Sequence, residues 1–213
     1  MIDLFIATFI SLFVIVDPLG SASVFAAITK DMSKQDARRI ALKGVVIAIS
    51  ILMVFAFIGE ALLHHMGISL HAFRVAGGTL LFVTAFQMIM GAKGADHFAE
   101  GMTSSPQGLQ SLAVYPVAIP LLAGPGCMTA VVLHASEAAS LSGITIVAFA
   151  VLVVQLISLL TMLMSVRIVS FMGHTGSSIT ARIVGILLAA LSVQFIADGI
   201  RGLMNAHNGI AGF

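Results

Sequence analysis

Proline and glycine occur together, beside polar side chains, in the middle of two long apolar stretches. Asp17-Pro18-Leu19-Gly20 interrupts the first stretch, and Gly124-Pro125-Gly126 interrupts a later one. Because Gly and Pro are the poorest helix formers, each motif predicts a break in a helix. A broken helix offers free N–H groups to an anion at one end and free C=O groups to a cation at the other. These residues could therefore bind a small charged ligand.

Asp17 is the strongest single candidate for a binding role. An Asp before a Pro is a preferred helix start, and as a cap it stabilises the helix by about 1 kcal/mol. A carboxylate in the middle of a bilayer, however, costs about 2.5–3.5 kcal/mol on insertion scales. Ser or Asn would cap the helix without that charge. We therefore expect Asp17 to bind a substrate ammonium group or to carry a coupling proton, with a purely capping role as the alternative.

The other candidates surround the two breaks or lie on later spans. Glycines beside prolines are expected to expose backbone, or to allow close helix packing. Hydroxyl groups could bond a substrate carboxylate or their own helix, and two glutamines could contact substrate or join helices. The predicted binding set is Asp17, Pro18, Gly20, Ser21, Ser23, Gln87, Gly124, Pro125, Gly126, Thr129 and Gln194.

No catalytic residue, metal ligand or cofactor is predicted. The serines of the first break have no histidine at mid-span to act as a base, so an intramembrane enzyme is disfavoured. The histidines at 64, 65 and 71 fit no strong zinc pattern. Cys127 is the only cysteine, which excludes a disulfide within the chain and a dithiol carrier. The sequence has no nucleotide-binding motif, so ATP is not expected to drive transport directly.

The composition is that of an integral membrane protein. Of the 213 residues, 59% are hydrophobic and 9% are charged, against about 25% charged in soluble domains. The net charge of +1, with no dense basic run, argues against a nucleic-acid partner. Six stretches are long and apolar enough to span a bilayer: 4–28, 42–63, 72–91, 112–134, 142–165 and 181–203.

The distribution of positive charge predicts the orientation. The first stretch resembles a signal-peptide core, but no Lys or Arg precedes it, so a membrane helix is the better interpretation. Eight Lys and Arg residues lie in or beside the first, third and fifth connections, and two lie on the other side. The positive-inside rule places the eight in the cytoplasm and both termini outside.

Internal spacing predicts two related halves. Pro125 follows Pro18 by 107 residues, and Arg74-x-x-Gly77 recurs 108 residues later as Arg182-x-x-Gly185. We therefore expect an all-α membrane protein with a first three-helix repeat (1–91), a cytoplasmic connecting loop (92–111) and a second three-helix repeat (112–213). Because three is odd, the second repeat is inverted. Helices 1 and 4 would then be broken at mid-membrane and would form a site near the midplane.

Four segments also carry a family resemblance. They are "DPLGSASVF", "FRVAGGTLLFVTAF", "AIPLLAGPGCMT" and "GILLAALSVQFIADGI", and the likeness extends over nearly the whole chain. With these motifs the sequence resembles the MarC family of bacterial and archaeal membrane proteins, some of which are described as small neutral amino acid transporters. Ser21, Ser23 and Gln87 depart from the family pattern, which usually has Asn, a second Pro and often a carboxylate at these places. The resemblance implies a location in the inner membrane.

Together with the resemblance, which implies amino acid transport, these observations predict secondary transport of small neutral amino acids, coupled to H⁺ or Na⁺. The expected partners are the amino acid substrate and the lipid bilayer. Two alternatives stay open at this point: an exporter or drug-resistance-type permease with the same architecture, and a membrane scaffold or regulator that transports nothing.

Overall fold

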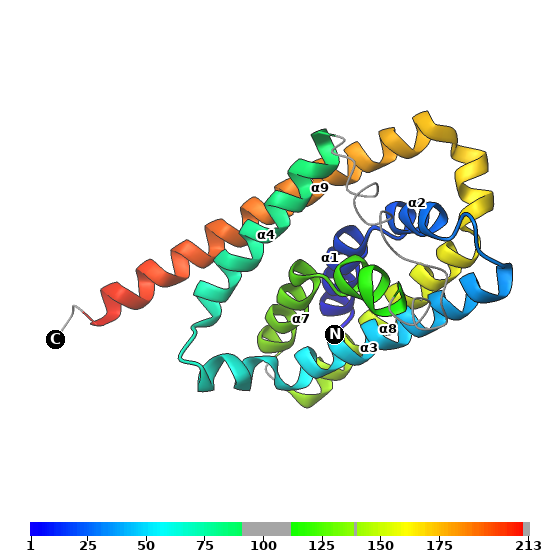
Figure 1. Ribbon diagram of the computed structural model, residues 1–213. Helices are drawn as coiled ribbons and strands as arrows, with labels where there is room; N and C mark the ends of the chain where they lie inside the picture. The colour runs from blue at the N-terminus through cyan, green and yellow to red at the C-terminus, as the bar shows by residue number, and fades with distance from the viewer. Residues whose placement is uncertain (91–111, 139, 211–213) are drawn as a thin grey trace.

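The structure, a computed structural model, describes residues 1–90, 112–138 and 140–210, and the described elements are helices (Figure 1). The predicted connecting loop at 92–111 lies outside these residues. The helical elements are α1 (Ile2–Val16), α2 (Pro18–Ile28), α3 (Lys34–His65), α4 (Leu70–Met90), η1 (Ala113–Leu122), α7 (Pro125–Glu137), α8 (Leu141–Leu163) and α9 (Ser165–Ile210).

Local residues explain where the long helices begin and end. The side chain of Ser33 accepts a hydrogen bond from Asp36 N at 3.1 Å, so α3 starts eight residues before the predicted apolar span. Ser140 caps α8 in the same way through Gly143 N. The predicted connection between the last two spans, residues 166–180, is helical apart from one sharp turn at Gly173 within α9. The φ of 64° at this turn suits glycine.

Five of the six predicted spans correspond in place to helices of the structure. Five stretches are long and apolar enough to cross a membrane: Ile2–Ile28, Lys34–His65, Leu70–Met90, Leu141–Leu163 and Gly176–Ala206. The predicted fourth span corresponds to two shorter segments, η1 and α7, which are bent by 54° at the predicted second break and make a sixth span if the pair crosses the membrane as one. The chain is therefore an all-helical, multi-pass membrane protein.

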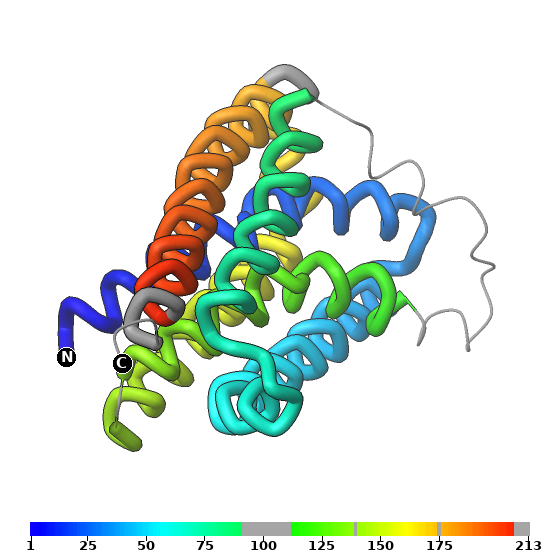
Figure 2. The backbone as a smooth tube through the Cα atoms, turned by 90° about the vertical axis from the view of Figure 1, so that its left-hand side faces the viewer, coloured from blue at the N-terminus to red at the C-terminus, as the bar shows by residue number. Residues whose placement is uncertain are grey.

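Two groups of helices make up the described molecule. In the first, α3 and α8 pack around α1, η1 and α7, and Figure 1 shows α7 between α1 and α4 of the second group. In the second, α4 and α9 lie side by side along much of their length, as Figures 1 and 2 both show. Glycines permit this close pairing: a Cβ on Gly78 would lie 2.9 Å from Ser192 O, and one on Gly199 would lie 2.8 Å from His71 O.

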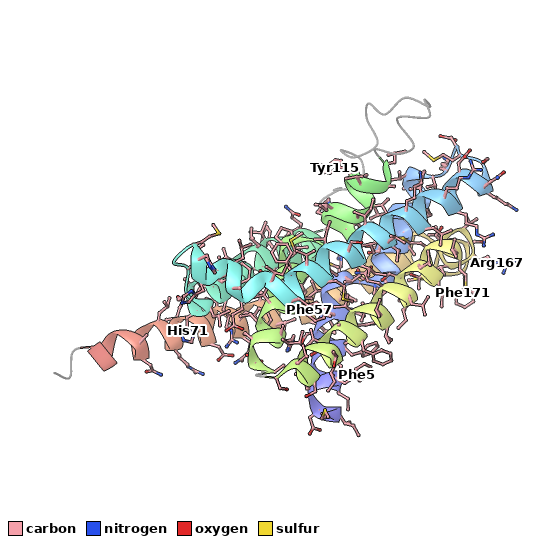
Figure 3. All side chains as sticks on the ribbon, turned by 90° about the horizontal axis from the view of Figure 1, so that it is seen from below. Phe5, Phe57, His71, Tyr115, Arg167 and Phe171 are labelled. Atoms are coloured by element: carbon pink, nitrogen blue, oxygen red, sulfur yellow. The ribbon has the colours of Figure 1, made fainter. Side chains whose placement is uncertain are left out.

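The outer surface is apolar, as expected of helices that face lipid. Phe57 and Phe171 are 51% and 94% exposed, and both side chains lie on the outside of the molecule in Figure 3. The buried face of α1 instead consists of one stripe, Thr8, Leu12 and Val16. Small residues and polar groups are thus held inside, where the two breaks also lie.

Candidate functional site

The first break is a single residue, Asp17, between α1 and α2. Its backbone is left-handed (φ 44°, ψ 74°), a conformation that Asp and Asn tolerate better than most residues. Asp17 N donates to Phe13 O at 3.0 Å, and Asp17 O accepts from Ser21 N at 2.8 Å. The carboxylate accepts from Gly20 N at 3.1 Å, and the residue as a whole is 9% exposed. Asp17 therefore ends one helix and caps the next.

The break falls where the sequence predicts it but is narrower than predicted. The motif suggests an unwound turn over Asp17–Gly20, whereas α2 already begins at Pro18. Pro18 occupies the first helical position, where its missing N–H and fixed φ are tolerated. Gly20 and Ser21 consequently lie in the first turn of α2.

The second break is wider than the first and begins earlier than predicted. Tyr115 and Ile119 have extended backbone inside η1 (φ −130° and −127°), each directly before a proline. Residues before proline are pushed out of the helical region, which accounts for both interruptions. After the end of η1, Gly124 occupies the position just before α7, and no side chain caps the start of this helix. A Cβ on Gly124 would lie 2.6 Å from Pro120 O, so the backbone fits only glycine there.

Helix α8 is hydrogen-bonded to both breaks. Gln155 Nε2 donates to Leu122 O at 3.1 Å, at the end of η1. Thr161 Oγ1 donates to Pro18 O at 3.0 Å, at the start of α2. The two anchoring residues are six positions apart, or about 9 Å along the helix axis. Sequence reasoning missed both of them, although the amide of Gln155 within "VLVVQLISLL" is a visible signal.

The predicted hydroxyl groups bond to backbone carbonyls of neighbouring turns. Ser21 Oγ donates across the first break to Val16 O at 2.8 Å, and Thr129 Oγ1 donates to Pro125 O at 2.9 Å. Ser23 Oγ lies 3.2 Å from Leu19 O and 3.1 Å from Ser177 Oγ, which links α2 to α9. In this conformation these hydroxyls stabilise the broken helices.

The two predicted glutamines lie apart from the buried break residues. Gln87 on α4 and Gln194 on α9 both have exposed side chains. Gln194 Nε2 donates to Asp198 Oδ2 at 2.8 Å, one turn along the same helix. The structure therefore places Asp17, Ser21 and Thr129 in the interior but leaves these two amides on the surface.

Helix α4 covers the buried face of α7. A Cβ on Gly77 would collide with Thr129, and one on Gly126 would collide with Leu81, so both glycines permit close packing. These contacts bring the second break against α4 as well as α8.

A charged cluster joins the other end of α7 to α4. The guanidinium of Arg74 pairs with Glu137, and His134 Nδ1 lies 4.0 Å from Glu137 Oε2. Within residues 1–90, 112–138 and 140–210, no three His, Cys, Asp or Glu side chains gather closely enough to hold a metal ion. The cluster therefore links two helices by charge.

Comparison with known proteins identifies the family. A family model described as "MarC family integral membrane protein" matches residues 2–204. A UPF0056 membrane protein of Methanocaldococcus jannaschii is 36% identical over 200 residues, covering 94% of this chain and 97% of the relative. A UPF0056 membrane protein of Aquifex aeolicus is 36% identical over 205 residues, covering 94% of each chain.

A bacterial relative gives a similar result. The UPF0056 membrane protein YhcE of Escherichia coli is 32% identical over 195 residues, covering 92% of this chain and 91% of the relative. The relatives therefore come from both bacteria and archaea. No solved structure matches the chain. Because the family model and these relatives extend over nearly its whole length, the chain belongs to the MarC family of integral membrane proteins.

Proposed function

We propose that the protein is a secondary transporter of small neutral amino acids, with its binding site at the two helix breaks. The observation that carries the proposal is the carboxylate of Asp17, a residue that is 9% exposed, at a break that α8 ties to the second break. A buried carboxylate in a membrane span is costly and typically serves an ion or substrate pathway. Broken helices are the usual binding elements of secondary transporters.

The two breaks offer complementary groups to a zwitterion. The uncapped start of α7 at Gly124 presents N–H groups, which favour the substrate carboxylate. Asp17 supplies a negative charge for the substrate ammonium, or carries the coupling proton or Na⁺. A neutral amino acid carries both charged groups on one α-carbon and so matches this arrangement.

The proposed fold is a pair of inverted three-helix repeats, with both breaks near the membrane midplane. Reciprocal packing supports it. Helix α3 of the first half packs on η1 and α7 of the second half, and helix α8 of the second half packs on α1 and α2 of the first half. In the same way α4 contacts α7 while α9 contacts α2, and the pairs α3–α8 and α4–α9 contact each other. Exchanging the halves reproduces these main contacts, as expected of two halves related by a pseudo-two-fold axis.

Inverted repeats make a topological prediction. With both termini outside, the turn before Lys34 is cytoplasmic and the end of α7 at Ser136 is external. Reporter fusions at these two positions are expected to report opposite sides of the inner membrane. Reports from the same side would contradict the inverted arrangement and would favour η1 and α7 as a re-entrant hairpin.

Uptake by the purified protein tests the proposed function. In proteoliposomes, a panel of labelled amino acids is expected to include small neutral members that accumulate under a proton or Na⁺ gradient. Counterflow, with unlabelled amino acid preloaded inside, distinguishes a bidirectional carrier from a protein without transport activity. Absence of uptake, counterflow and efflux for the whole panel would overturn the proposal and favour a scaffold or regulator. Transport confined to larger drug-like compounds would favour the permease alternative.

A further inference from the structure

The amide of Gln155 has one bonded end and one free end, although it is only 1% exposed. Its Nε2 donates to Leu122 O at 3.1 Å. Among the described residues, none donates a hydrogen bond to Oε1. The carbonyl of Leu122 determines which way the amide lies, because a flipped amide would place two acceptor oxygens against each other. The free atom is therefore an acceptor at the second break.

A second buried polar atom without a partner lies on the facing helix. Thr8 is fully buried on α1, and no described residue bonds its Oγ1. The ring of Phe5 lies 5.7 Å from that of Phe149, and Figure 3 shows Phe5 beside α8. Further along the chain, Thr161 of α8 bonds Pro18, just after the end of α1. Because the later residue of one segment contacts the later residue of the other, α1 and α8 run side by side in the same direction. That register places Thr8 about one helical turn from the level of Gln155.

We infer that Gln155 Oε1 and Thr8 Oγ1 bind the ammonium group of the amino acid substrate at the second break. The inference rests on the proposed function and assigns one end of the substrate. An ammonium group has three N–H donors, so it can satisfy both acceptors at once. The uncapped start of α7, three residues after Leu122, takes the carboxylate attached to the same α-carbon. Asp17, at the first break, is then left to the coupling ion.

Burial makes this pair of acceptors selective. Leu122 and Ala123 have no exposed surface, so water does not compete freely with a ligand at Gln155. A site with buried hydrogen-bonding groups rejects a substrate that leaves them unpaired. The structure therefore assigns to Gln155 and Thr8 the discrimination between an amino acid and the same acid without its amine.

Competition in proteoliposomes tests the assignment. Uptake of labelled L-alanine is measured against unlabelled L-alanine and against propionate, which has the carboxylate but no ammonium group. For the wild type we expect alanine to compete about ten- to a hundred-fold better than propionate, as befits a charge-assisted hydrogen bond. In Gln155→Met this ratio is expected to fall by about ten-fold or more through a higher KM for alanine.

Three further variants keep the test decisive. Thr8→Val removes the hydroxyl at nearly constant shape and should also lower the ratio, whereas Thr8→Ser retains the hydroxyl and should preserve it. Ser158→Ala is the matched control, because that buried hydroxyl on α8 already bonds Val154 O at 3.0 Å in its own helix. If Gln155→Met is not recovered from membranes, the alanine-to-propionate ratio of Thr8→Val tests the inference instead.

An unchanged alanine-to-propionate ratio in Gln155→Met, or in Thr8→Val where only that variant is recovered, would overturn the inference while leaving transport itself intact. A change in Na⁺ dependence with an unchanged ratio would overturn it as well, because the acceptors would then bind the metal ion. A wild type that neither takes up nor exchanges any amino acid fails at the proposed function, before any variant is compared.

Discussion

Replacing Asp17 with Asn, Gly and Ala separates its structural role from its charge. The residue combines a left-handed backbone at φ 44°, a cap on Gly20 N at 3.1 Å and a buried carboxylate. Asn keeps the backbone preference and the capping oxygen but removes the charge. Gly keeps only the backbone freedom, and Ala keeps none of the three.

The expected stabilities follow from these differences. Loss of an N-cap to Ala costs about 1 kcal/mol, and the left-handed conformation costs a residue such as Ala about 1–2 kcal/mol more, so Asp17→Ala should lose about 2–3 kcal/mol. Asp17→Gly loses only a few tenths of a kcal/mol for the cap. Asp17→Asn loses about 0.3–1 kcal/mol of attraction between the carboxylate and the start of α2, offset by easier burial of a neutral group.

Two measurements on the same preparations check this reasoning. Unfolding by SDS in mixed micelles, followed by circular dichroism, should rank Ala well below Asn, Gly and the wild type. Uptake of labelled amino acid between pH 5 and pH 8 should be lost, or become independent of pH, in all three variants. Asn is the informative one, because its fold is expected to be nearly normal.

Either measurement could refute the argument. Full, pH-dependent uptake by Asp17→Asn would remove the carboxylate from the mechanism and leave Asp17 as a cap. An Asn variant as unstable as the Ala variant would show that the charge itself is needed for folding, which the observed hydrogen bonds do not explain.

Two further predictions concern α7. Gly124→Ala should destabilise the protein by about 1–3 kcal/mol and abolish uptake, because its Cβ would lie 2.6 Å from Pro120 O. Gly176→Ala is the control, because the added methyl group there meets no backbone atom. Equal effects of the two substitutions on unfolding would contradict the packing argument. Arg74→Met and Glu137→Gln should each lower the free energy of unfolding by about 0.2–1 kcal/mol, because Glu137 is about half exposed. The double variant should lose less than the sum of the two single losses. Additive losses in SDS unfolding would show that the ion pair contributes nothing.

The spans and the position of the breaks could be predicted because they depend on local chemistry. Long apolar stretches define the spans, and Pro18 and Pro125 define the starts of α2 and α7. The extent of each break was harder to predict. Asp17 alone suffices for the first because one left-handed residue redirects the chain, whereas residues before prolines extend the second through much of η1.

The partners of the breaks could not be predicted because they depend on tertiary packing. Gln155 and Thr161 bond carbonyls 33 and 143 residues earlier in the chain, and a single sequence carries no record of such contacts. Gln87 and Gln194 show a related limit. The sequence suggested that they contact substrate or join helices, but the sequence does not determine which face of a helix is buried, and both side chains are exposed.

The anchoring of both breaks by α8 has a consequence for biogenesis. Pro18 O, in the first turn of α2, can accept from its own helix, but its link to α8 forms only when Thr161 has been synthesised, and 143 residues take about 7–30 s at roughly 5–20 residues per second. Leu122 O, at the end of η1, has no following turn of its own helix to supply a donor. An unpaired carbonyl in lipid costs several kcal/mol, so the nascent η1 is expected to stay beside water or the insertion machinery until Gln155 has been synthesised. The donor for Leu122 O, Gln155, is synthesised only 33 residues later. The amino-terminal half therefore completes its fold only after the fifth span has entered the membrane, and chains truncated before α8 should be rapidly degraded.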